Sequence, residues 1–262
     1  MTGGEAAAQK KGIEKIPRPE IKHVVAVMSG KGGVGKSSIT ALLAVGARQQ
    51  GFQVGILDAD ITGPSIPKMF GLKSNYRVVG GFKPMESSQG LKIMSLNLLL
   101  GSEDDPVIWR GPLIGGAIKQ FWQEVNWGEL DYLFIDLPPG TSDAPLTVLQ
   151  TIPLDGVVIV FSPQDLAIMV VKKAIKMAAN MGIPILGLVE NMRDFICPHC
   201  RTRVDVFGRG KGDEIAEGSG IPLLGSIPLD YNLAKCCDEG RVEEYDSNLF
   251  AKLQEVQSRR CQ

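Results

Sequence analysis

The ten residues SGKGGVGKSS, at positions 29–38, restrict the fold of this 262-residue chain more than any other part of its sequence. They follow the apolar run HVVAVM, and their last two serines begin the segment SSITALLAVGARQQG, whose apolar residues recur at helical spacing before Gly51. Their pattern matches G-x-x-x-x-G-K-[ST], a loop between a strand and a helix whose backbone N–H groups surround a polyphosphate. A chance glycine-rich turn is the alternative, but the flanking strand and helix favour a phosphate-binding loop.

The residues of this loop have expected roles in nucleotide binding. The glycines allow positive φ and a close approach of the backbone to the ligand, and the helix that begins near Lys36 directs its free N–H groups at the phosphates. We expect Lys36 to contact the β- and γ-phosphates and the Ser37 hydroxyl to be a Mg²⁺ ligand. The predicted nucleotide-binding residues of the loop are Gly30, Lys31, Gly32, Gly33, Val34, Gly35, Lys36, Ser37 and Ser38.

The composition is that of an ordinary globular protein, with 44% hydrophobic residues, 22% charged residues and a net charge of −1 at pH 7. This balance gives no reason to expect a nucleic-acid or membrane partner, and no apolar run is long enough to cross a bilayer. The N-terminus lacks the apolar core of a secretory signal. We therefore expect a flexible tail over residues 1–19 and a single cytoplasmic domain over residues 20–262.

Strand-like and helix-like segments alternate along the chain. Strands are expected at 23–29, 53–58, 91–99, 131–136, 156–162, 183–191 and 222–228, and helices at 36–50, 111–125, 143–151, 164–181, 209–218, 230–239 and 246–259. Short, continuously apolar strands that are each followed by a helix indicate a parallel sheet covered on both faces. The predicted fold class is therefore α/β, a P-loop NTPase with a mostly parallel twisted sheet and helices on both faces.

Three aspartates follow apolar strands at the edge where α/β sheets bind their ligands. Asp136 ends the run YLFID and is the expected partner that holds Mg²⁺. Asp58 and Asp60 lie one residue apart, so they would share a face of an extended strand. One of them could join the Mg²⁺ shell and the other could orient water. The alternatives are a strand-end turn at Asp136 and a solvated turn at the other two.

The loop has a lysine besides Lys36, and this residue, Lys31, indicates which class of P-loop protein the chain resembles. The motif KGGVGKS resembles the deviant Walker-A ATPases, which include MinD, ParA, the arsenite-pump ATPase, the nitrogenase iron protein and the Mrp/ApbC group. The resemblance implies that Lys31 crosses a nucleotide-sandwich dimer to the phosphates of the other subunit. It also implies that Asp60 orients the attacking water, that Asp136 holds Mg²⁺ through water, and that Asn191 lies against the adenine of ATP.

A C-x-x-C motif at Cys197 and Cys200 lies in a loop near residues 193–205. Such a pair serves redox, zinc or iron–sulfur chemistry, and it can also be two inert buried cysteines. A tetrahedral metal site requires four ligands, which two such pairs would supply in a two-fold dimer. His199 could also ligate, although a side chain between two ligands more often points away. Basic neighbours that favour thiolate are Arg193, Arg201 and Arg203.

Several segments along the chain resemble, in the same order, those of the Mrp/ApbC family of iron–sulfur cluster carrier ATPases. They include LDADITGPSIPKMFG, VIWRGP, DYLFIDLPPGTSDAPL, VIVFSPQDLAIMVVKKAIKMA, IPILGLVENM, CPHC and LLGSIPLD, and the resemblance covers about residues 20–245. It implies a homodimer, or a heterodimer with a paralogue, that holds a [4Fe–4S] cluster between subunits and passes it to apo iron–sulfur proteins. Relatives often continue with glycine after CPHC, where this chain has Arg201.

Two other functions remain open from the sequence. A MinD/ParA-like positioning ATPase would need a membrane or DNA tether, and the mildly amphipathic C-terminal segment lacks a dense basic face. An ATPase dimer with a structural zinc would place Zn²⁺ on the same four thiolates. The remaining cysteines belong to no ligand motif. We expect Cys236 and Cys237 to have a structural role and Cys261 to lie in the tail.

Overall fold

The computed structural model describes residues 16–60, 65–73, 82–95, 111–141, 143–164 and 167–260. Its centre is an eight-stranded sheet in the order β10-β7-β6-β1-β5-β2-β4-β3, in which only the edge pair β3–β4 is antiparallel. The strands are β1 Ile21–Ser29, β2 Val54–Asp58, β3 Met85–Glu86, β4 Lys92–Ser95, β5 Leu130–Asp136, β6 Gly156–Phe161, β7 Ile185–Asn191 and β10 Leu223–Ile227.

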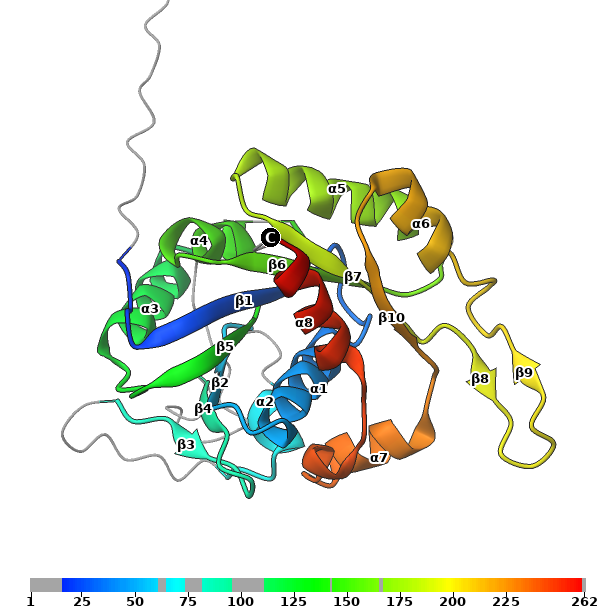
Figure 1. Cartoon of the computed structure of the whole chain (residues 1–262), viewed down its shortest axis with the longest axis horizontal. Helices are drawn as coiled ribbons and strands as arrows, with labels where there is room; N and C mark the ends of the chain where they lie inside the picture. Colours follow the sequence, from blue (N-terminus) through cyan, green and yellow to red (C-terminus); the bar gives the residue numbers. More distant parts are fainter. Residues whose placement is uncertain are drawn as a thin grey trace, which may run out of the picture.

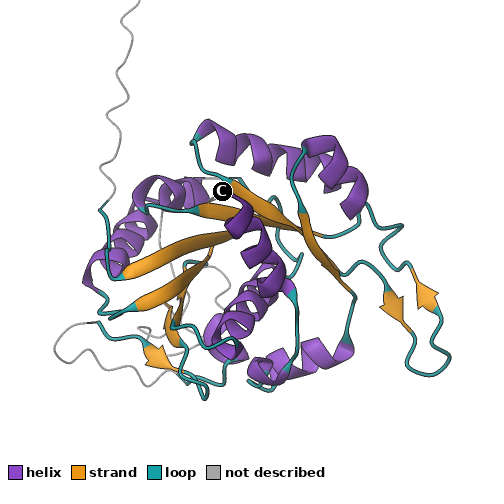
Figure 2. Cartoon of the chain, viewed as in Figure 1, coloured by secondary structure: helices purple, strands orange, loops and turns teal. Residues whose placement is uncertain are grey.

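Helices cover both faces of this sheet (Figures 1 and 2). The helices are α1 Lys36–Gln49, α2 Ile66–Met69, α3 Gly111–Glu124, α4 Asp143–Thr151, α5 Ala167–Asn180, α6 Gly212–Ser219, α7 Tyr231–Asp238 and α8 Leu249–Arg260, with a 3₁₀ turn at Val242–Glu244. One core lies beneath α3, α4 and α5, and a second lies beneath α1, α7 and α8. Because both faces are buried, the central strands are apolar throughout, which explains why their sequences show no alternation.

The predicted fold class is confirmed, and the differences lie at the edges. The strand expected at 91–99 is described only as Lys92–Ser95, and residues 96–99 lie outside the described part of the chain. The short antiparallel strand β3 was not expected. Neither was a separate two-stranded hairpin, β8 Phe195–Ile196 and β9 Arg203–Val204, which carries the C-x-x-C motif beyond the sheet (Figure 1).

The boundary of the folded part lies earlier than expected. The Nε1 of Trp122 donates a hydrogen bond to the carbonyl of Ile16 at 2.8 Å. The guanidinium of Arg18 donates to the carbonyl of Val125 at 2.9 Å and also binds the carbonyl of Trp122. These carbonyls belong to the last turn of α3 and its continuation, where a helix leaves acceptors unpaired. Residues 16–19 therefore belong to the fold and not to a flexible tail, and residues 1–15 lie outside the described residues.

The C-terminal helix α8 is part of the core. Its residues Leu249, Phe250 and Leu253 are fully buried, and they pack with α1 and with the sheet. The apolar stripe at helical spacing therefore faces the protein interior. Among the described helices, none is both long enough and apolar enough to span a membrane.

Candidate functional site

The phosphate-binding loop connects β1 to α1 at the carboxyl edge of the sheet. Gly33 and Gly35 both have a φ of 77°, the left-handed conformation that glycine adopts without steric cost. The left-handed Gly35 immediately precedes α1, so the helix begins at Lys36 as the motif predicts. The loop lines a cleft of about 240 Å³ together with Asp60 and Pro139. Free N–H groups at the start of α1 make this cleft suited to an anion.

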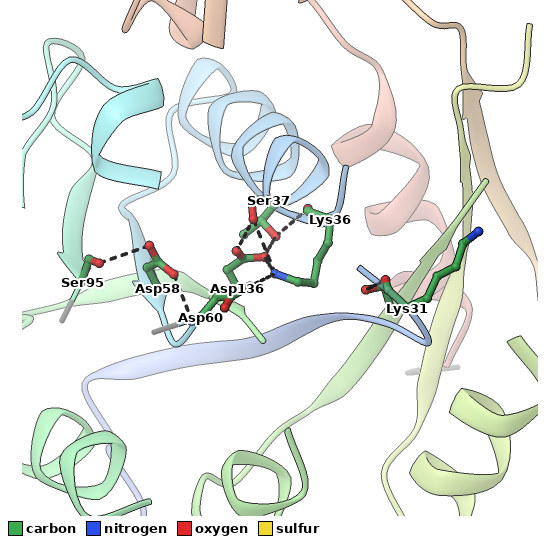
Figure 3. Close-up of polar contacts among 9 residues, drawn as sticks. Lys31, Lys36, Ser37, Asp58, Asp60, Ser95 and Asp136 are labelled. Atoms are coloured by element: carbon green, nitrogen blue, oxygen red, sulfur yellow. Dashed lines mark hydrogen bonds and ion pairs between the residues drawn. The ribbon is translucent and has the colours of Figure 1, made fainter. Parts of the chain in front are cut away.

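Lys36 and Asp136 form the buried centre of this site (Figure 3). The ammonium of Lys36 lies 2.8 Å from Asp136 Oδ1, and the lysine is only 5% exposed. The hydroxyl of Ser37 donates to Asp136 Oδ2 at 2.6 Å, and that of Thr40 donates to Asp136 Oδ1 at 2.8 Å. The carboxylate is therefore held by one cation and two hydroxyls. This arrangement brings together the loop lysine, the loop serine and the strand-end aspartate that the sequence predicted to act as one site.

The two aspartates after β2 have different environments. β2 ends at Asp58, so Asp60 lies beyond the strand, and a shared face for the two carboxylates remains a prediction. Asp60 Oδ2 lies 3.7 Å from the ammonium of Lys36. Asp58 instead accepts hydrogen bonds from the Ser95 hydroxyl at 3.1 Å and from the backbone N–H of Asp60 at 3.1 Å. Burial, and then the neighbouring carboxylate of Asp136, raise the pKa of Asp58 well above its usual value.

Lys31 points away from the buried centre (Figure 3). Its ammonium donates to the side-chain carbonyl of Gln164, which follows β6. The two loop lysines thus have different partners, since Lys36 faces the carboxylates of its own site. The contact of Lys31 with a phosphate of another subunit remains a prediction.

Asn191 ends β7 and contacts the phosphate-binding loop. Its side-chain amide donates to the carbonyl of Val34 at 2.9 Å, and the residue is buried. A Cβ atom on Gly35 would overlap the Nδ2 of Asn191, so the absence of a side chain at Gly35 is what lets the two segments meet. Asn191 therefore lies at the loop, where the sequence predicted a nucleotide-binding residue. Its contact with adenine remains a prediction.

The C-x-x-C motif lies at the turn of the β8–β9 hairpin. Cys197 is half-buried and Cys200 is exposed. The backbone N–H of Arg201 donates to the carbonyl of Cys197 at 2.9 Å, and the N–H of Cys197 donates to the carbonyl of Thr202 at 3.0 Å. These bonds close the chain into a compact turn that presents both sulfurs on one loop.

Thr202 activates one thiol of the pair. Its hydroxyl oxygen lies 3.2 Å from Cys200 Sγ. Hydrogen bonds from this hydroxyl and from the Thr202 backbone, together with the neighbouring Cys197, lower the pKa of the Cys200 thiol to about 7. A substantial fraction of Cys200 is therefore thiolate at neutral pH, and thiolate is the form that binds metals.

The other metal-binding candidates do not join this pair. Within the described residues, no group of three or more His, Cys, Asp or Glu side chains is arranged to hold a metal ion. Cys237 is buried in the core beside α1, with its sulfur 4.0 Å from Ser38 Oγ, and burial raises its pKa. Cys236 is half-buried on the same helix, and Cys261 lies outside the described residues. The described part of one chain thus offers two sulfurs on the hairpin, which is half of a four-thiolate site.

Comparison with known proteins places this geometry in a family. A family model described as ParA, NUBPL iron-transfer P-loop NTPase, matches residues 20–259. The chain belongs to this family. Membership confirms the resemblance found in the sequence and places the chain among nucleotide-hydrolysing P-loop proteins.

Several relatives of this ParA/NUBPL chain are similar over most of its length. The iron-sulfur cluster carrier protein of Methanocaldococcus jannaschii is 49% identical over 224 residues, which are 84% of this chain and 77% of that protein. The cytosolic Fe-S cluster assembly factor NUBP2 of Gallus gallus is 41% identical over 247 residues, which are 90% of each protein.

Solved structures share the fold. A nucleotide-binding protein from Archaeoglobus fulgidus, solved in complex with ADP and found to contain cobalt, is 50% identical and covers 88% of this chain and 92% of its own, with a TM-score of 0.79. The MinD of the MinC:MinD complex from Aquifex aeolicus is 18% identical and covers 90% of this chain and 96% of its own, with a TM-score of 0.65. At that identity the MinD likeness shows the fold alone.

Four residues of the site were not found from the sequence. Thr40 lies one helical turn after Lys36, and this spacing could have indicated it. The others meet their partners only through the tertiary fold or a local turn, for which the sequence carries no spacing signal. These residues are Thr40, Ser95, Gln164 and Thr202.

Proposed function

We propose that this protein is an ATP-hydrolysing carrier that holds a [4Fe–4S] cluster between two subunits and transfers it to apo iron–sulfur proteins. The observation that carries the proposal is a pair of accessible sulfurs, Cys197 and Cys200, on a hairpin of a P-loop NTPase. The names of the M. jannaschii and G. gallus relatives support the cluster as cargo. We also propose that it acts in the cytoplasm, as the name of the chicken relative states for that protein.

The nucleotide half of the proposal assigns roles at the buried centre. Lys36 leaves Asp136 and contacts the β- and γ-phosphates, because phosphate oxygens offer it more negative charge than one shared carboxylate. Asp60 orients the attacking water, since it lies near Lys36 and faces the cleft. Asp58 supports this site from beneath through its bond to the Asp60 N–H. Asn191 lies against the adenine from the end of β7, where it contacts the loop.

A magnesium ion fits the donors that surround the cleft. Mg²⁺ prefers oxygen ligands and usually retains several waters. The Ser37 hydroxyl and the Asp136 carboxylate are in direct contact and supply such oxygens. These two residues would hold the ion, Asp136 through water, and the ion would neutralise charge on the phosphates.

Lys31 is proposed to act across a dimer. Its ammonium lies outside its own phosphate cleft and donates to Gln164. In a dimer with the two nucleotides between subunits, Lys31 of each chain would reach the phosphates of the partner. ATP would then stabilise the dimer, because each nucleotide contacts both chains. A homodimer meets this requirement, and a heterodimer with a paralogue that has the same loop also meets it.

The cysteine half of the proposal follows from ligand number. Two hairpins that meet on a two-fold axis supply four thiolates, the ligand set of a [4Fe–4S] cluster. Zn²⁺ takes the same four thiolates in a tetrahedral site. The alternative function is therefore an ATPase dimer with a structural zinc. A MinD/ParA-like positioning role has less support, because the C-terminal helix is used in the core and the MinD likeness concerns only the fold.

The test is anaerobic reconstitution with iron and sulfide, followed by metal and sulfide analysis, absorption spectra and light scattering. We expect one cluster per dimer. Cys197→Ser and Cys200→Ser should each lose the cluster almost wholly, because symmetry removes two of the four ligands. Cys236→Ser, a half-buried cysteine outside the hairpin, is the matched control and should retain the cluster.

Two results would contradict the proposal. Zinc bound in place of iron and sulfide under these conditions would support the structural-zinc alternative. One tightly bound centre per monomer would contradict sharing between subunits.

A further inference from the structure

Three polar residues, Ser95, Asp58 and Asp136, lie side by side at the carboxyl edge of the sheet. Strand pairing places Asp58 opposite Ser95 of β4 on one side and opposite Asp136 of β5 on the other. Residues two positions apart on a strand share a face, and the residues two positions earlier in all three strands belong to the core beneath α1. The three polar side chains therefore form a row on the face that carries the phosphate-binding loop and its helix.

Asp58 connects Ser95 to Asp60. Its Oδ2 accepts a hydrogen bond from the Ser95 hydroxyl at 3.1 Å, and its Oδ1 accepts one from the backbone N–H of Asp60 at 3.1 Å (Figure 3). Asp58 is 1% exposed and Ser95 is fully buried, so bulk water does not reach this pair. Each oxygen of the Asp58 carboxyl group therefore has a donor from the protein itself, one from β4 and one from the backbone after β2.

Only the Asp60 end of this connection reaches the phosphate-binding cleft. Asp60 lines the cleft, and its Oδ2 lies 3.7 Å from the ammonium of Lys36. Asp58 and Ser95 are not among the residues that line the cleft. An effect of Ser95 on a nucleotide bound there would therefore have to pass through Asp58.

The burial of Asp58 makes its position depend on the Ser95 hydroxyl. A buried carboxyl oxygen that loses its donor is costly, because no water replaces the lost hydrogen bond. The neighbour on the other side cannot replace it, since Asp136 is itself a carboxylate that accepts from Ser37 and Thr40. Without the hydroxyl, the Asp58 side chain would turn to find another donor, and its bond to the Asp60 N–H would weaken.

We propose that Ser95 is a positioning residue for ATP hydrolysis. Its hydroxyl fixes the carboxyl group of Asp58, and Asp58 holds the backbone at Asp60, so that the Asp60 side chain stays where it orients the attacking water. The inference rests on the proposed function, because hydrolysis and the role of Asp60 belong to that proposal. It gives a function to a residue that lies outside the phosphate-binding loop and outside the nucleotide cleft.

The experiment compares three variants of the full chain. Ser95→Ala removes the hydroxyl, and Ser95→Thr keeps a hydroxyl and adds one methyl group. Ser87→Ala is the matched control, because Ser87 is also buried and its hydroxyl also donates to a carboxylate, that of Glu243 at 2.5 Å. Ser87 does not line the nucleotide cleft. The two alanine variants therefore lose the same kind of buried bond, one beside Asp58 and one away from it.

Steady-state ATP hydrolysis and titration with fluorescent ATP separate positioning from binding. We expect Ser95→Ala to lower kcat about tenfold, the effect of one hydrogen bond, while KM and the dissociation constant of ATP match the parent. Ser95→Thr should restore most of the lost kcat, and Ser87→Ala should keep the parent kcat. On an Asp58→Ala background, Ser95→Ala should cause no further loss, because the residue through which it acts is gone.

Hydrogen exchange at the Asp60 amide, followed by NMR without nucleotide, tests the same connection without any measurement of activity. The Asp60 N–H should exchange faster in Ser95→Ala than in the parent, because its acceptor is no longer fixed. In Ser87→Ala and Ser95→Thr its exchange should match the parent.

Equal kcat values for Ser95→Ala and Ser87→Ala would overturn the proposal. A loss of ATP affinity in Ser95→Ala as large as the loss of kcat would also overturn it, and so would the same loss of kcat with and without Asp58. If the parent does not hydrolyse ATP, the proposed function is rejected instead, and exchange at the Asp60 amide still decides whether Ser95 fixes Asp58.

Discussion

Replacement of Gly35 by alanine should destabilise the nucleotide-free protein because the added methyl group would collide with Asn191. The same replacement at Gly33 is the matched control. Both glycines have a φ of 77°, so an alanine pays the left-handed penalty at either position. Around Gly33 there is nothing within 4 Å of an added Cβ, whereas at Gly35 the Cβ would overlap the amide of Asn191. Both variants therefore pay the left-handed penalty, and only Gly35→Ala also disturbs Asn191.

The magnitudes follow from these contacts. Gly33→Ala should lower the free energy of unfolding by about 1 kcal/mol, which is the left-handed penalty alone. Gly35→Ala should also displace Asn191 from the carbonyl of Val34, where its bond is buried and 2.9 Å long. Loss of a buried hydrogen bond with its groups left unpaired costs about 2 kcal/mol. The total near 3 kcal/mol should lower Tm by roughly 6–12 °C, against roughly 2–4 °C for Gly33→Ala.

Thermal unfolding followed by circular dichroism, without nucleotide and with a chelator, measures both values. A double-mutant cycle isolates the contact, since on an Asn191→Ala background the alanine at Gly35 should cost only the left-handed penalty. Equal losses for Gly33→Ala and Gly35→Ala, or the same cost of Gly35→Ala in both backgrounds, would refute the reasoning.

Three further predictions concern single side chains. Lys36→Ala should abolish ATP binding, whereas Lys31→Ala should bind ATP but lose most hydrolysis and nucleotide-driven dimerisation. Titration with fluorescent ATP measures the binding, and light scattering measures the dimerisation. Equal loss of ATP binding in the two variants would place both lysines on one nucleotide. Asp60→Asn should retain ATP affinity while steady-state turnover falls by about 10²–10⁴; normal turnover would assign the water to another residue. Alkylation of Cys200 should accelerate as pH passes about 7, because thiolate is the reactive form. Thr202→Val should move the midpoint of this pH dependence upward by removing a hydrogen bond that stabilises the thiolate. An unchanged midpoint would contradict the role of the hydroxyl.

The phosphate site was predictable because its parts are local in sequence or lie at strand ends. The loop motif defines a strand, a turn and a helix within a few residues, and the geometry follows from glycine and the helix terminus. Asp136 could be placed beside the loop because parallel strands end at one edge of the sheet. The orientation of Asp58 could not be predicted, since it depends on where β2 stops and on Ser95 of another strand.

Other features depend on contacts that sequence periodicity does not record. The boundary near residue 16 depends on Arg18 reaching carbonyls more than a hundred residues away. The partner of Lys31, Gln164, is 133 residues distant. The hairpin around the cysteines has strands of two residues, too short for a periodic signal. The first two contacts join residues that are distant in sequence, so only the folded structure reveals them.

A short segment after β7 connects the two proposed sites physically. Asn191 binds the phosphate loop at Val34. Three residues later, Asp194 pairs with Arg203 of the hairpin at 3.3 Å, and its carbonyl accepts from the N–H of Leu229 at 2.6 Å. Leu229 lines a cleft together with Phe195 and Ile196 of the hairpin. Residues 191–194 therefore contact the phosphate loop at one end and the cysteine hairpin at the other.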